Sequence, residues 1–174
     1  SNYRFPPPPK KPTMTAVPGN GKVTLYWDRV AEESLDPVTK EKDFQGYKIY
    51  RATDPNFNDV RNITDANGLI QGYSTLAQFD KKDEINGYFY PSKNLFQDTK
   101  GYSFYLGDDS GLVHSYIDRD VQNGRTYYYA LVAYDHGDEE KDIFPSENSK
   151  FISVLPTGQI ITDQNTAYIA PSSS

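Results

Sequence analysis

The amino-acid sequence predicts an all-β chain folded as an antiparallel β-sandwich. Three observations predict it: apolar and polar residues alternate in several short runs, turn-forming clusters of Gly, Pro, Asn and Asp separate these runs, and no stretch keeps a helical period. The chain has 174 residues, enough for one enlarged domain. Apolar residues make up only 36% of the chain but aromatics reach 14%, so we expect a core rich in Tyr.

The overall charge and the missing residue types exclude several classes of protein. A net charge of -6 disfavours nucleic-acid binding, which relies on clustered Lys and Arg. The chain has no Cys, so disulfides and thiolate metal sites are excluded, and no apolar run is long enough for membrane insertion. The chain begins at Ser1 without a signal peptide, and we expect a processed chain or a piece of a longer protein.

The first third of the chain contains a linker and three predicted strands. Residues 1–11 include four consecutive prolines, which favour a stiff polyproline II linker; a docking peptide for a proline-binding groove is the alternative. Residues 13–17 form a short predicted strand, and a dense turn signal follows it. Residues 23–27 alternate as a half-buried strand, and residues 44–51 form the third strand.

Residues 52–111 are the least regular part of the sequence. Turn clusters alternate there with short aromatic runs, and nothing indicates a long helix. A structureless loop of this length is improbable inside a compact domain. We therefore expect this segment to fold against the sandwich, with its aromatic side chains covering one sheet face or an edge.

Regular alternation returns after residue 111. Residues 112–118 form a predicted strand, and residues 127–135 form the strongest one, apolar or aromatic on both faces, which is typical of a central strand covered on both sides. Residues 149–155 form the last predicted strand. Residues 157–174 are polar, and we expect a C-terminal linker or extension.

Several of these residues resemble those of fibronectin type III domains. Residues 23–28 are similar to the second strand of that family, with Trp27 in the core, and residues 46–51 are similar to its third strand. Val121 precedes Tyr127 by six positions with a glycine between them, which resembles the approach to the tyrosine corner. The resemblance implies that the Tyr127 hydroxyl bonds back to the loop backbone.

The resemblance implies a fibronectin type III-like, that is immunoglobulin-like, antiparallel β-sandwich over residues 12–156. The long insertion, about residues 52–111, would lie between the third strand and the later strands. The structural core would be built around Trp27, Tyr47, Tyr127 and Leu131. Residues 50–55 and 111–116 resemble segments of type III-like modules in large secreted or surface proteins of bacteria. This resemblance implies a multidomain, extracellular and non-catalytic protein.

One loop follows part of the calcium-binding pattern, and calcium is the only cofactor that the sequence suggests. Asp54, Asn56, Asn58 and Asp65 occupy the first, third, fifth and twelfth positions of such a loop. Asp59 stands where the pattern needs Gly, and Asp65 stands where it needs Glu. The alternative is an ordinary Asp-Pro-Asn turn. Two further acidic loops, residues 107–111 and 135–142, are either calcium sites at a domain junction or solvated loops.

The tyrosines of the 52–111 segment suggest a second kind of site. Sugar rings stack on exposed aromatic side chains, so these residues are candidates for glycan binding: Tyr88, Tyr90, Tyr102 and Tyr105. The alternative is that they pack the segment onto the sandwich.

The sequence does not indicate an enzyme. His114 and His136 are the only histidines, and neither a zinc-hydrolase motif nor a phosphate-binding loop is present. We expect a non-catalytic extracellular structural, adhesive or assembly module that contacts neighbouring domains or protein subunits. The alternatives are a carbohydrate-binding module and an accessory domain of a secreted hydrolase.

Overall fold

The computed structural model describes residues 7–63, 70–90 and 104–173 of the chain. Apart from two short 3-10 helices, its regular elements are strands. In chain order the elements are β1 (Met14–Gly19), β2 (Lys22–Trp27), η1 (Val30–Glu33), β3 (Phe44–Ala52), η2 (Asn58–Val60), β4 (Arg61–Ile63), β5 (Ile70–Tyr73), β6 (Ala77–Asp80), β7 (Ser115–Asp118), β8 (Tyr127–Asp135), β9 (Ile152–Val154), β10 (Ile160–Thr162) and β11 (Thr166–Ile169).

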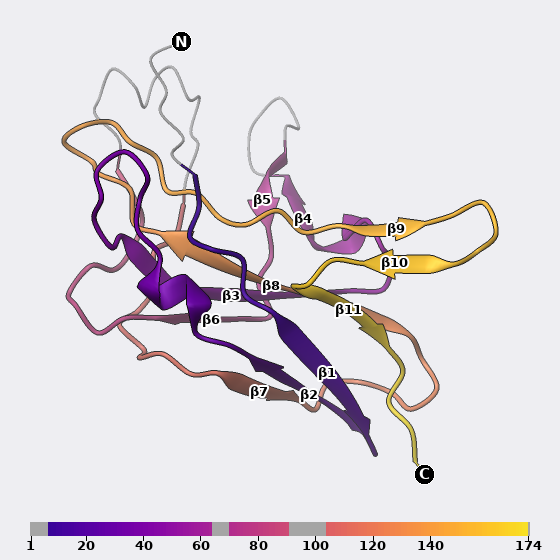
Figure 1. The fold of residues 1–174 in the computed structure, drawn as a ribbon. Coiled ribbons are helices and arrows are strands. Elements are labelled where there is room, and N and C mark those ends of the chain that lie inside the picture. Colours follow the sequence, from indigo (N-terminus) through magenta and orange to yellow (C-terminus); the bar gives the residue numbers. More distant parts are fainter. Residues whose placement is uncertain (1–6, 64–69, 91–103, 174) are drawn as a thin grey trace.

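Two antiparallel sheets form a β-sandwich, which confirms the all-β prediction. One sheet has three strands in the order β1-β2-β7, and the other has four in the order β11-β8-β3-β6. Two small hairpins, β4-β5 and β9-β10, lie on the other side of the four-stranded sheet from β1, β2 and β7 (Figure 1). The described part of the chain therefore has three layers rather than two.

Local sequence determines the first hairpin. β1 and β2 pair in register from Met14↔Trp27 to Gly19↔Lys22, which leaves Asn20 and Gly21 as a two-residue turn. Gly21 has a φ of 67°, and Asn-Gly favours the tight turn that matches the twist of two paired strands. This register turns the Trp27 side chain toward the second sheet.

The core between the sheets is built largely from aromatic side chains. All four residues expected at its centre lie in one buried cluster: Trp27, Tyr47, Tyr127 and Leu131. The Trp27 and Tyr47 rings meet edge to face with their centroids 5.7 Å apart. Such pairs stabilise a protein beyond the area that they bury.

The outer face of the four-stranded sheet is covered as well. One cluster packs Phe57 and Ile152 against Tyr50 and Val132, and a second packs Phe89, Phe104, Leu106 and Phe144 against Tyr134. The segment 52–111 supplies several of these side chains, in agreement with the expectation that its aromatics cover a sheet face. Residues 77–80 of the same segment form β6, which pairs with β3 at the sheet edge.

Side chains complete the pairing of β8 beyond its strand partners. β3 pairs along one edge of β8, but β11 pairs with the other edge only from Tyr127 to Ala130. Past that point, Asn165 Nδ2 donates to the Leu131 carbonyl at 2.9 Å. Asn148 Oδ1 then accepts the Ala133 N–H at 2.8 Å. Two asparagines thus replace a strand where the backbone of β8 is buried.

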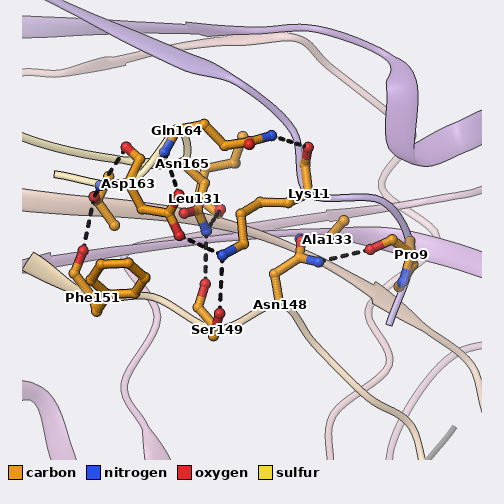
Figure 2. A network of polar contacts seen from close by, with 11 residues as sticks. Pro9, Lys11, Leu131, Ala133, Asn148, Ser149, Phe151, Asp163, Gln164 and Asn165 are labelled. Carbon is orange, nitrogen blue, oxygen red and sulfur yellow. Dashed lines mark hydrogen bonds and ion pairs between the residues drawn. The ribbon is translucent and has the colours of Figure 1, made fainter. Parts of the chain in front are cut away.

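Residues 9–11, part of the predicted linker, are bound to the domain by the same region (Figure 2). Asn148 Nδ2 donates to the Pro9 carbonyl at 2.8 Å. Lys11 Nζ lies 2.5 Å from Asp163 Oδ2 and donates to Ser149 Oγ at 3.0 Å. Three segments that are distant in the sequence therefore meet beside β8.

The C-terminal end of the sandwich differs from the sequence prediction. The prediction ends the domain at Pro156 and makes residues 149–155 its last strand. In the structure the strand within this stretch, β9, pairs with β10, and β11 is the strand beside β8. The polar composition of residues 157–174 hides β11, because a strand of four residues carries little periodic signal.

We expect Asn148→Ala to destabilise the domain by about 2–4 kcal/mol, since it leaves the buried Ala133 N–H and the Pro9 carbonyl without partners. Urea denaturation followed by circular dichroism measures the change. Asn123→Ala is the matched control, because the Asn123 side chain also makes two hydrogen bonds but lies in exposed loops. Equal losses in the two variants would contradict the role given to Asn148.

Candidate functional site

The predicted calcium loop is folded as a turn. Asp54 Oδ1 accepts the Asn58 N–H at 2.9 Å, and Asp54 Oδ2 accepts the Asn56 N–H at 3.0 Å. Asn58 Nδ2 also donates to Asp54 Oδ2, so these side chains bind one another. Asp65 lies outside the described residues. Within the described ranges, no group of three or more His, Asp or Glu side chains is placed to hold a metal ion.

The acidic loop at residues 107–111 is organised by a buried carboxylate that sequence reasoning did not identify. Asp80 is fully buried, and it accepts the backbone N–H groups of Asp108, Asp109 and Ser110 at 3.0–3.2 Å. A side chain at Gly107 would have its Cβ only 2.2 Å from the Asp80 carboxyl carbon. The loop therefore wraps closely around Asp80, and the Asp80 carboxylate has a structural role in holding the loop.

The candidate glycan-binding tyrosines are only partly brought together. Tyr88 and Tyr90 are 51% and 65% exposed, while Phe89 between them is buried. Tyr105 is half-buried, and its ring meets that of Tyr88 edge to face at 4.9 Å. Tyr102 lies outside the described residues. Tyr88 and Tyr105 therefore do not form a coplanar platform for a sugar ring.

Both histidines lie beside protein oxygen atoms. His114 Nε2 lies 2.5 Å from Glu32 Oε2, and the Tyr47 hydroxyl donates to the same oxygen at 2.6 Å. Burial, together with this bond to Glu32, raises the pKa of Tyr47 far above its usual value. His136 Nδ1 lies 2.5 Å from the Gly137 carbonyl.

A buried carboxyl group lies at the C-terminal end of β8. Asp135 is fully buried; its Oδ1 accepts the Ser146 N–H at 2.9 Å, while its Oδ2 has no hydrogen-bond partner in the described structure. Burial raises the pKa of Asp135 to about 8; backbone hydrogen bonds oppose this shift, and the nearby charge of Asp43 adds to it. Burial and the charge of Asp36 also raise the pKa of Asp43.

An ion pair ties the two sheets together near the other end of β8. Asp118 of β7 is only 2% exposed, and Arg51 Nη1 from β3 reaches its two carboxylate oxygens at 2.9 and 3.0 Å. The Tyr129 hydroxyl, from β8, donates to Asp118 Oδ2 at 2.7 Å. Replacing one member of such a network strongly destabilises the fold, because the buried charge that remains loses its partner.

A cleft of about 370 Å³ opens beside this network, between the residues that follow β3 and the β7–β8 loop. Arg51, Arg119 and Arg125 all line it, together with Asp59 and Asp120. The guanidinium groups of Arg51 and Arg125 lie 6.0 and 5.8 Å from the centre of the Tyr127 ring. Sequence reasoning missed this site, because single arginines from separate segments carry no motif.

Comparison with known proteins does not assign the chain to a family. No family model matches it, and neither the curated proteins nor the solved structures contain a significant match. None of the helices in the described ranges has the length and apolar character needed to cross a membrane.

The buried Asp135 predicts a pH-dependent stability. Its carboxyl group has a pKa near 3.8 when unfolded and about 8 when folded, so the folded state binds more protons between these values and stability falls as the pH rises through this window. We expect Asp135→Asn to raise the melting temperature at pH 8 more than at pH 5, because the amide stays neutral. Thermal melts from pH 4 to 9 measure this difference.

Glu140→Gln, at an exposed position, controls for the general loss of one negative charge. If Asp135→Asn and the unmodified chain gave parallel melting curves across the whole pH range, the assignment to Asp135 would be wrong.

Proposed function

We propose that the chain is a fibronectin type III-like, non-catalytic structural or adhesive module of a secreted or cell-surface protein, and that it contacts neighbouring domains or subunits. The observation that carries the proposal is the outer face of the three-stranded sheet. Lys22 points outward at one end of this face, but the six outward side chains at its centre are uncharged: Thr15, Val17, Thr24, Tyr26, Ser115 and Ile117.

This face is unusual for the chain that carries it. Charged residues make up 24% of the sequence, yet the centre of this sheet face has none. Val17, Tyr26 and Ile117 are 43%, 51% and 45% exposed. Exposed apolar patches with a polar surround are typical of protein–protein contact sites. Tyr is also among the residues enriched at such interfaces.

Two features support the fibronectin type III-like part of the proposal. The first two strands share a sheet with β7, whereas β3 crosses to the sheet that contains β8 and β11. The Tyr127 hydroxyl accepts the Gln122 N–H at 2.8 Å, which is the bond of a tyrosine corner. The first feature is the division of strands between the two sheets of an immunoglobulin-like sandwich, and the second is the bond that the resemblance implies for Tyr127.

The interface is testable by hydroxyl-radical footprinting of Tyr26. We expect Tyr26 to be oxidised readily in the isolated chain and at least fivefold more slowly in the native assembly that contains it. Tyr168, which is 47% exposed on β11, is the internal control and should react equally in both samples. Equal oxidation of Tyr26 in the two samples would exclude this face as the contact.

Glycan binding is the second candidate function, because Tyr88 and Tyr90 expose their rings to solvent. If it is correct, a neutral polysaccharide embedded in a native gel should retard the chain. The double variant Tyr88→Ala/Tyr90→Ala should bind about tenfold more weakly, or roughly 1.4 kcal/mol. Tyr168→Ala is the control for loss of an exposed ring. Unchanged migration of the parent chain on β-glucan, xylan and chitin gels would reject this function.

A further inference from the structure

The cleft beside Arg51 carries a small excess of positive charge on an acidic protein. Three arginines and two aspartates line it, whereas the whole chain has a net charge of -6. Their roles differ. The Arg51 guanidinium group already has protein partners, because it donates to both oxygens of Asp118 and its Nη2 lies 3.3 Å from Asp120 Oδ2.

The acidic residues of the cleft also have partners. Asp120 Oδ2 accepts a hydrogen bond from Arg51 Nη2. Asp59 Oδ2 accepts both the Thr53 N–H at 3.1 Å and the Thr53 hydroxyl at 2.9 Å. Neither carboxylate therefore faces the cleft without a partner. The Asp120 side chain is nonetheless 91% exposed, whereas the guanidinium groups of Arg119 and Arg125 have no such ion-pair partner among the described residues.

Arg119 and Arg125 are exposed, and within the described ranges neither guanidinium has a hydrogen-bond or ion-pair partner. Arg125 lies over the Tyr127 ring, a cation–π contact that restricts its position. Tyr127 is in turn held by its bond to Gln122 in the same loop. One of the two guanidinium groups is thus positioned before any ligand arrives.

We propose that this cleft binds a carboxylate-bearing segment of a partner protein through Arg119 and Arg125. The planar guanidinium group presents paired N–H donors that match the two oxygens of a carboxylate. A volume of about 370 Å³ accommodates an acidic side chain and part of its backbone. The proposal rests on the proposed function, since it names the chemistry of the neighbouring protein.

A peptide fits the lining better than an acidic sugar does. The aromatic ring in the cleft, that of Tyr127, is only 5% exposed and lies close to two guanidinium groups, so it offers no stacking surface. The exposed pair Tyr88 and Tyr90 is not part of the lining. Because the rest of the chain is acidic, the cleft also favours an acidic partner in one orientation.

Fluorescence polarisation with a labelled tetraglutamate peptide tests the proposal. We expect saturable binding that weakens with added salt, because the arginines are exposed. Arg119→Gln/Arg125→Gln should weaken it at least tenfold, while Arg29→Gln, which removes an exposed arginine outside the cleft, should not change it. Arg125→Lys keeps the charge but loses the paired donors, so an intermediate loss is expected.

Thermal melting shows that each variant is folded, and a tetraglutamine peptide controls for charge-independent binding. The proposal is overturned if tetraglutamate does not bind, if all variants bind it equally, or if inorganic phosphate or oligogalacturonate competes more strongly than unlabelled tetraglutamate. Footprinting of Tyr26 reports on a different face. If the unmodified chain does not bind tetraglutamate but Tyr26 is protected in the assembly, the cleft proposal alone is rejected. If the chain binds tetraglutamate but Tyr26 is not protected, the contact face alone is rejected.

Discussion

The central constraint on this structure is the hydrogen bonding of β8. Its inward side chains lie between the sheets, and its outward side chains lie under a third layer, so its backbone has no access to water on either face. Every N–H and carbonyl must therefore find a protein partner. β3 satisfies one edge, and β11, Asn165, Asn148 and the bridge from Tyr134 to Glu147 satisfy the other in turn.

This constraint also determines where the ends of the domain lie. Asn148 and Asn165 are buried because β8 needs their side chains, and the residues around them then bind Pro9 and Lys11. The N-terminal and C-terminal segments are thus held against the same strand. The Asn165 Oδ1 atom still has no hydrogen-bond partner in the described structure. The backbone of β8 thus finds hydrogen-bond partners along both edges, while one buried side-chain oxygen has none.

The third layer divides the surface into faces of different character. It covers the outer face of the four-stranded sheet, which leaves the outer face of β1, β2 and β7, with its uncharged centre, in contact with solvent. The two ends of β3 and β8 differ as well. At one end Arg51 pairs with the buried Asp118, and at the other burial raises the pKa of Asp135. The arginine cleft and the buried carboxyl group thus lie at opposite ends of the central strands.

The sequence by itself determined the all-β class, the turn between the first two strands and the two-sided cover of β8, because alternation and turn chemistry are local. The resemblance of its strands to those of fibronectin type III domains also indicated Trp27 and Tyr127 as core residues. Only the tertiary structure decided that β6 and β11 are edge strands and that Asp54 closes a turn. Only the fold placed Arg119 and Arg125 in one cleft. These features depend on which distant segments meet, and short strands or single arginines carry no local pattern that specifies their partners.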